Sequence, residues 1–115
     1  MKIFRWQQGR QGSGYEKALI ATAPFPVPFD CYLLRYSTGA FVPRHVDQVQ
    51  QGERHFRLNI VLNKKFVGGD FQHEGKPIYE SKRIKIFRPD LLPHWVTPVK
   101  VGTRYVLSIG WILRD

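Results

Sequence analysis

Short runs of alternating hydrophobic and polar residues dominate this chain of 115 residues, and they predict strands separated by turns. In HFRLNIVLN (55–63) a leucine or isoleucine recurs at every second position, so polar side chains such as Arg57 and Asn59 point to the opposite side. RIKIF (83–87) alternates basic and apolar residues in the same way. Further strands are expected in CYLLRY (31–36), in DFQ and PIYE around Gly75, in HWVTPV (94–99) and in TRYVLSIGWI (103–112).

The last of these runs has two faces of different character. Arg104, Val106, Ser108 and Gly110 share one face, and Tyr105, Leu107, Ile109 and Trp111 share the other. We expect the second face, which is apolar throughout, to pack in the core or against another element.

Helical periodicity is scarce, and a single segment shows it. YEKALIATA (15–23) predicts one short helix, which Pro24 would end. PFPVPF (24–29) has prolines at alternate positions, so it must be extended along a surface or a sheet edge. Many short strands with regular turns predict an all-β fold, a sandwich or barrel, in a single domain spanning residues 1–115.

Composition adds a strong positive charge to this picture. Eighteen Lys and Arg against nine Asp and Glu leave a formal net charge of +9. That balance favours an anionic partner such as nucleic acid, an acidic protein or a small polycarboxylate. A positive surface that only keeps the protein soluble would explain the same number, so charge alone does not choose among these partners.

Cysteine usage and the N-terminal residues bear on the compartment. Cys31 is the only cysteine, so an internal disulfide cannot form and nothing requires an oxidising compartment. The N-terminal segment lacks the apolar run of a signal peptide, and no stretch approaches the roughly 18 apolar residues of a membrane span. We therefore expect a soluble, cytoplasmic protein that does not bind membranes. The sequence does not determine its oligomeric state.

The segment PRHVDQVQ (43–50) carries the first chemical signal. In a strand, residues i and i+2 face the same way, so His45 and Asp47 would project together while Val46 turns away. An imidazole and a carboxylate on one face can bind one metal ion, but two ligands are too few for a tight site. A third ligand should therefore come from elsewhere in the chain.

Three histidines are candidates for this third ligand. His94 lies at the head of a predicted strand but is remote in sequence, so the fold would have to bring it in. His55 is close to Arg54 and Arg57, which disfavours a cation, and His73 lies in a glycine-flanked loop. Two histidines and one carboxylate on one side of a metal form the facial triad of non-haem iron(II) oxygenases, which leaves positions open for a cosubstrate and dioxygen.

The ordered set of His45-Val46-Asp47, then His94, then Arg104 ten residues later resembles the motif of the Fe(II)- and 2-oxoglutarate-dependent dioxygenases, in particular the prolyl-4-hydroxylase-like branch. RYSTGAFVPRHVD resembles that branch's strand, glycine turn and metal-binding segment. LNIVLN followed by GGDF resembles its YLN…GGE stretch, and HWVTPVKVGTRYVLSIGW resembles its closing segment. The resemblance runs from about residue 31 to residue 111.

The resemblance implies a double-stranded β-helix, a jelly roll of two facing sheets. It implies that His45, Asp47 and His94 bind Fe(II). It also implies that Arg104 points into the barrel and binds the far carboxylate of 2-oxoglutarate, for which a guanidinium offers two parallel hydrogen bonds. The activity implied is oxidative decarboxylation of 2-oxoglutarate with O2, coupled to hydroxylation or demethylation of a substrate that the sequence does not identify. The resemblance also puts Tyr36 at a position where related enzymes often have a tyrosine that contacts 2-oxoglutarate.

Other features of the prolyl-4-hydroxylase-like branch are matched less closely by this sequence. Asn59 shares a face with Arg57 and would donate to the same cosubstrate, but the aromatic residue common in the branch near position 61 is replaced by Val61. In related enzymes N-terminal helices usually pack against the large sheet, and such helices are nearly absent from this sequence. A non-catalytic jelly-roll binding module, including one that binds nucleic acid, is the alternative function, although such a module would gain nothing from keeping all four site residues.

Overall fold

The protein, described here from a computed structural model, forms twelve strands and no helix within residues 5–9, 13–24 and 27–114, the part of the chain that the structure describes. The strands are β1 (Trp6–Gln8), β2 (Tyr15–Ala23), β3 (Phe29–Tyr36), β4 (Val42–His45), β5 (Glu53–Val61), β6 (Phe66–Gly68), β7 (Phe71–His73), β8 (Tyr79–Glu80), β9 (Ile84–Phe87), β10 (His94–Val96), β11 (Val99–Gly102) and β12 (Arg104–Arg114). Within this part of the chain no helix exists that would be long and apolar enough to cross a membrane.

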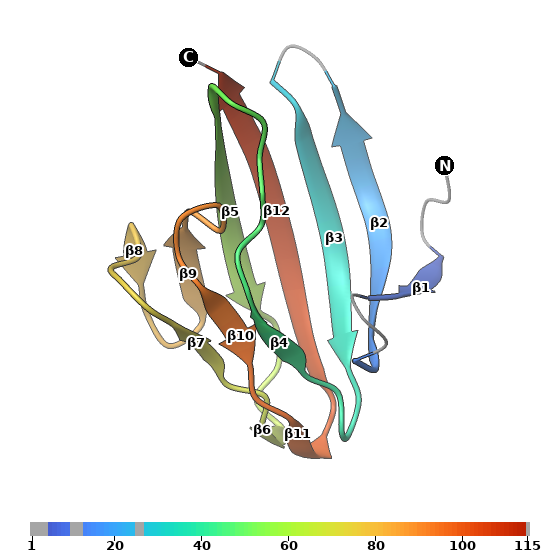
Figure 1. Ribbon diagram of the computed structural model, residues 1–115. Coiled ribbons are helices and arrows are strands. Elements are labelled where there is room, and N and C mark those ends of the chain that lie inside the picture. The colour runs from blue at the N-terminus through green and yellow to red at the C-terminus, as the bar shows by residue number, and fades with distance from the viewer. Residues whose placement is uncertain (1–4, 10–12, 25–26, 115) are drawn as a thin grey trace.

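The strands form one large sheet and two small ones, and all their pairings are antiparallel. The large sheet has the strand order β1-β2-β3-β12-β5-β9-β8, and the small sheets have the orders β4-β10-β7 and β11-β6. Figure 1 shows the β4-β10-β7 sheet in front of β5, β9 and β12 of the large sheet. This two-layer arrangement confirms the all-β jelly roll that the strand pattern and the resemblance predicted.

The hydrophobic core lies between these layers. Tyr36 and Val106 come from the large sheet, and Val42 and Val96 come from the small one; all four are less than a tenth exposed. Burial of each such side chain stabilises the fold by about 1.5–3 kcal/mol. The core is small, because polar side chains and a cavity take up much of the space between the sheets.

Residues 15–23 form strand β2 and not the predicted helix. Their alanine, glutamate, lysine and leucine residues favour helix in isolation, but β2 pairs with β1 on one side and β3 on the other. In this strand Tyr15 and Lys17 face the interior cavity. Tertiary pairing therefore overrides local helix propensity here.

The proline-rich segment after β2 joins β2 to β3. Residues 25 and 26 lie outside the described part of the chain, so the prediction of an extended segment is not tested there. Its described residues Pro24, Val27 and Phe29 are exposed, as expected for a surface connection.

The two faces of β12 differ in burial. The face of Arg104, Val106, Ser108 and Gly110 is the buried one and looks into the space between the layers. Residues on the apolar face, such as Leu107 and Ile109, are only half-buried and lie on the outside of the large sheet. The predicted alternation is correct, and Arg104 points inward as the resemblance implied; of the two places expected for the apolar face, the core between the layers is not the one it occupies.

A polar row crosses the inner face of the large sheet at Gly110. Gly110 pairs with Asp30 on one side and with Arg57 on the other. The Arg57 guanidinium passes over the glycine and donates to Asp30 at 2.9 Å and to Ser108 Oγ at 2.7 Å. A Cβ at position 110 would lie 2.1 Å from Arg57 Nη2, so only glycine leaves room for this crossing.

We predict that Gly110→Ala lowers the free energy of unfolding by about 1–3 kcal/mol, because the added methyl group pushes Arg57 away from Asp30 and Ser108. Urea unfolding followed by circular dichroism measures the change. The matched test is the same substitution in an Arg57→Ala background, where the clash is gone and Gly110→Ala should be nearly neutral. Equal losses in the two backgrounds would contradict this account.

Candidate active site

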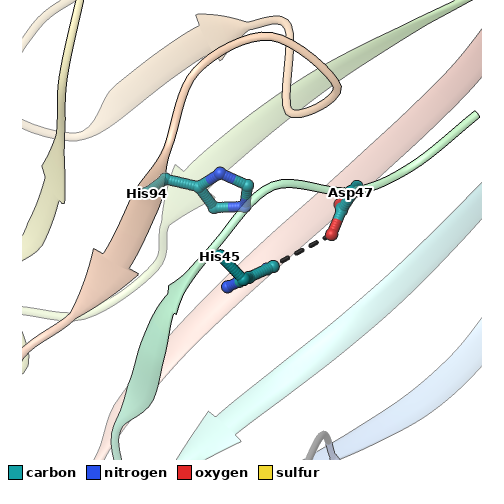
Figure 2. A group of neighbouring side chains, drawn as sticks. All are labelled: His45, Asp47 and His94. Carbon is teal, nitrogen blue, oxygen red and sulfur yellow. Dashed lines mark ion pairs between the residues drawn. The ribbon is translucent and has the colours of Figure 1, made fainter.

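Pairing between β4 and β10 brings His45 and His94 together from positions 49 residues apart in the chain. The two residues are direct partners in the antiparallel register, and their ring centroids lie 4.2 Å apart. Asp47 follows β4, and its backbone N–H donates to the Pro89 carbonyl at 2.8 Å, which anchors the segment beside the β9–β10 loop. Figure 2 shows His45, Asp47 and His94 converging, with the Asp47 carboxylate 3.2 Å from His45 Nε2.

Backbone carbonyls set the orientation of both imidazoles. His45 Nδ1 lies 2.7 Å from the Pro43 carbonyl, and His94 Nδ1 lies 2.8 Å from the Leu92 carbonyl. A carbonyl can only accept, so each Nδ1 carries a proton, and Nε2 is the nitrogen of each ring that can face a metal. This is the arrangement that orients histidines toward a metal in characterised sites.

The three side chains fit a metal ion. One ligand atom from each of His45, Asp47 and His94 can be chosen so that all three lie within 4.8 Å of one another. Two imidazole nitrogens and one carboxylate oxygen, all on one side, match the donor set of a facial triad. Of the three histidines considered for the third ligand, the structure thus brings His94 to the pair.

The other two histidines have different partners. His73 pairs with His94 across β7 and β10, but its Nε2 lies 2.8 Å from the Glu80 carboxylate. His55 Nε2 lies 3.3 Å from the Arg57 guanidinium. Burial, and then the charge of Arg57, hold the pKa of His55 below its ordinary value, so this ring is neutral at physiological pH.

Arg104 is a buried cation on the opposite sheet. Its side chain belongs to a residue only 4% exposed, and burial lowers its pKa from the ordinary value. None of the ion pairs between described residues includes it. Tyr36 and the charge of Asp70 oppose this effect of burial but do not outweigh it, so the guanidinium is suited to bind an anion that enters the cavity. Gly69 makes room for it: an added Cβ would lie 3.1 Å from Arg104 Cδ.

Two stacked tyrosines line the wall beside Arg104. Tyr36 is its direct partner across β3 and β12, and the guanidinium carbon lies 4.9 Å from the Tyr36 ring centroid. Burial raises the pKa of Tyr36 to about 12, with Arg104 opposing the rise, so the phenol keeps its proton. Tyr15 stacks on Tyr36 at 5.1 Å between centroids. The helix predicted for residues 15–23 gave Tyr15 no role in the site, whereas the alternation of a strand points Tyr15 inward.

Asn59 belongs to the polar row on the floor of the cavity. Its side-chain oxygen accepts from Ser108 Oγ at 2.6 Å, and Ser108 in turn accepts from Arg57. The expected pairing of Asn59 with a cosubstrate stays a prediction. The contribution of Arg57, Ser108 and Asp30 was not foreseen, because the alternation of residues shows which face they share but not which strands become neighbours.

Most of these side chains, though not His73 and Glu80, line one cavity of about 660 Å3. Its lining includes the three possible metal ligands, Arg104, both tyrosines, the polar row and the loop residues Gln48, Val49 and Gln50. The volume falls within the roughly 300–1,000 Å3 of small-molecule sites, so a dicarboxylate at Arg104 leaves room for part of a substrate near the histidines.

Comparison with known proteins places this geometry in context. The profile of the 2OG-Fe(II) oxygenase superfamily matches residues 31–113. No curated protein matches the chain.

Several solved structures share the fold. A prolyl-4-hydroxylase from Pseudomonas putida is 19% identical with a TM-score of 0.70, and the match covers 96% of this chain and 77% of that one. A viral collagen prolyl hydroxylase from Paramecium Bursaria Chlorella virus-1, in complex with 2OG, is 18% identical with a TM-score of 0.62, covering 89% and 80%. KdgF from Halomonas sp. is 18% identical with a TM-score of 0.61, covering 96% and 88%.

The family match extends over most of the chain and includes every residue of the His45, Asp47, His94 cluster as well as Arg104. It covers the strands that form the central part of the large sheet and all of the small sheets. The chain therefore belongs to the 2OG-Fe(II) oxygenase superfamily, whose members use Fe(II), 2-oxoglutarate and O2.

Proposed function

We propose that this protein is an Fe(II)- and 2-oxoglutarate-dependent oxygenase that hydroxylates a C–H bond of a substrate reaching into the cavity. The observation that carries the proposal is that two features meet in one cavity: a His-Asp-His cluster at the small sheet, and on the large sheet a buried arginine that forms no ion pair with a described residue. Hydroxylation of an N-methyl carbon would give a hemiaminal, which breaks down to the N–H group and formaldehyde, so demethylation belongs to the same chemistry.

Each part of the cavity has a proposed task. His45, Asp47 and His94 would hold iron(II), with Nδ1 of both rings fixed by backbone carbonyls. Arg104 would bind the far carboxylate of 2-oxoglutarate, and the protonated Tyr36 hydroxyl would donate to the same group. When bound, these cofactors supply the oxidising chemistry, in which 2-oxoglutarate loses CO2 and becomes succinate while one oxygen atom of O2 goes to the substrate.

The substrate is proposed to be anionic or polymeric. A net charge of +9 favours an anionic target, and the exposed loop residues Gln48 and Gln50 are part of the cavity lining, where a larger molecule could contact them. Nucleic acid and acidic protein both fit this description. A binding module that keeps the cavity without turnover is the competing function, and a turnover measurement separates the two.

We predict that anaerobic addition of Fe(II) and 2-oxoglutarate produces a visible charge-transfer band, and that His94→Ala abolishes it. Removing one of three ligands should weaken Co(II) binding by more than about 100-fold, which titration calorimetry can measure without turnover. His73→Ala is the matched control, since His73 sits beside His94 on β7 but binds Glu80. A band that survives in His94→Ala would refute the assigned ligand set.

Replacing Arg104 should weaken cosubstrate binding without affecting the metal. We predict that Arg104→Met raises the dissociation constant of 2-oxoglutarate by about 100-fold or more, because the carboxylate loses its buried cationic partner. Co(II) affinity should stay unchanged in the same protein. The control is Arg83→Met, an exposed arginine, which should bind 2-oxoglutarate as the wild type does. Equal affinities in the two variants would rule out the proposed role of Arg104.

Turnover is tested by succinate formation from 2-oxoglutarate with Fe(II) and O2. We expect slow succinate release alone, and faster release when a single-stranded oligonucleotide or an acidic peptide supplies the matching substrate. Stimulation should fall as salt is raised, since the attraction to an anionic polymer is screened. Metal and 2-oxoglutarate binding with no succinate under any condition would favour the binding module.

A further inference from the structure

Lys17 is a cation in the cavity that has no task in the proposed chemistry. It lies on β2, where it pairs with Leu34 of β3, and its half-buried side chain lines the same cavity as the metal ligands and Arg104. None of the ion pairs between described residues includes it. The adjacent Glu16 points to the other face of β2 and is paired with Arg35 at 2.9 Å. Lys17 therefore brings a positive charge to the cavity wall without an ion-pair partner among the described residues.

The carboxylates in the cavity lining are engaged elsewhere. Besides Lys17, the charged side chains of the lining are those of Asp30, Asp47, Glu53, Arg57 and Arg104. Asp30 is paired with Arg57 at 2.9 Å, and Glu53 is paired with an arginine outside the lining, Arg114, at 3.1 Å. Asp47 belongs to the metal-binding cluster. Lys17 and Arg104 are therefore the two cations of the lining that form no ion pair with a described residue.

The proposed cofactors would neutralise the charges of the cavity except that of Lys17. Asp47 and the near carboxylate of 2-oxoglutarate would balance the two charges of iron(II), and Arg104 would balance the far carboxylate. One positive charge then remains, on the Lys17 ammonium. Its contact with the Tyr32 ring, whose centroid lies 5.1 Å from Nζ, contributes only about 0.5–1 kcal/mol and leaves the charge in place. A substrate group with one negative charge would complete the balance.

The Lys17 ammonium lies at a different level of the cavity from Arg104. Arg104 pairs with Tyr36 on β3, whereas Tyr32, whose ring contacts the ammonium, pairs with Ser108. Tyr32 and Tyr36 are four residues apart, which corresponds to about 13 Å along the strand. Figure 1 shows the β4-β10-β7 sheet in front of β5, β9 and β12, while the middle of β2 and β3 stands beside it. Lys17 and Tyr32 thus lie on the side of the cavity that the small sheet leaves uncovered, where a substrate can enter.

We propose that Lys17 and Tyr32 form a second anion-binding site in the cavity, which holds a carboxylate or phosphate group of the substrate while Arg104 holds the cosubstrate. The ammonium supplies the charge, and the Tyr32 hydroxyl supplies a hydrogen bond. Burial, and then the charge of Asp30, raise the pKa of Tyr32, so the phenol keeps its proton and can donate it. Asp30 repels such an anion little, because Arg57 neutralises it. The assignment of this anion to the substrate rests on the proposed function, but binding at the site is measured without turnover.

Inorganic phosphate and acetate are the probes, since they supply the two kinds of oxyanion. In the wild-type chain without metal, the backbone amide signals of Tyr32 and Leu34 in 1H–15N NMR spectra should shift and saturate. The dissociation constant for the better probe should be on the order of 1–10 mM. Uncharged acetamide, at the same ionic strength, should cause no saturable shift. Tighter binding of phosphate would indicate a phosphate group on the substrate, and tighter binding of acetate a carboxylate; either order supports the site.

Variants separate this site from Arg104. Lys17→Met should weaken binding of the better probe by about 10–100-fold, because a charge-assisted hydrogen bond is lost, and Lys17→Arg should restore most of the affinity. Lys64→Met, at an exposed lysine between β5 and β6, is the matched control and should bind the probe as the wild type does. Arg104→Met should leave the same amide shifts unchanged, although it weakens 2-oxoglutarate binding.

Three results would overturn the proposal. One is a wild-type titration that does not saturate with either probe by about 100 mM, and this result needs no variant that could misfold. Another is an affinity that Lys17→Met leaves unchanged. The third is a loss of 2-oxoglutarate affinity in Lys17→Met, because Lys17 would then belong to the cosubstrate site. Failure of the proposed function looks different: Co(II) and 2-oxoglutarate would not bind, while the probe would still bind at Lys17.

Discussion

Antiparallel pairing of β12 with β3 and β5 controls both faces of this protein. The register places Ser108 between Tyr32 and Asn59, so every even-numbered residue from 104 to 110 looks inward. Because side chains alternate with a period of two, a slip of one residue would turn Arg104 outward and Ile109 inward. The cavity chemistry and the apolar outer surface are therefore two consequences of one hydrogen-bonding register.

The space between the two layers is suited to binding ligands more than to hydrophobic packing. Much of the space between the layers is lined by charged and polar groups, among them Arg104, Arg57 and Asp30, and the buried apolar core is correspondingly small. Arg57 and Asp30 neutralise each other, whereas Arg104 has no carboxylate partner among the described residues. Ligands that bind only the folded chain add their binding free energy to its stability, so a metal and a dicarboxylate would stabilise this fold as well as equip it for chemistry.

The candidate site exists only when the two layers are assembled. His45 and His94 come from neighbouring strands of the small sheet, while Arg104 and Tyr36 come from neighbouring strands of the large one. Rigid strands hold these four residues, and loops contribute only Asp47. Sites on strands are held more precisely than sites on loops, which suits a reaction in which a cosubstrate must be held at a defined distance from a metal.

Local patterns in the sequence were sufficient to predict several features of the site and of β12. The i, i+2 spacing placed His45 and Asp47 on one face, and the alternation along 104–111 separated the two faces of β12 correctly. The ordered motif then singled out His94 among three histidines, through its resemblance to a family and not through geometry. By contrast, local helix propensity misled the assignment of residues 15–23, and with it the role of Tyr15.

Only the tertiary structure decided which face of each strand became the interior. Alternation shows that Ser108 and Ile109 point in opposite directions, but apolar character left open whether the Ile109 side packs in the core or against another element. In the structure the Arg104 side is the inner one, because it faces the small sheet with its histidines, and the Arg57–Asp30 pair across Gly110 satisfies the polar groups there. The sequence by itself determined periodicity and residue chemistry, whereas pairing between distant strands determined what each face meets, since such contacts depend on neighbours that no local window contains.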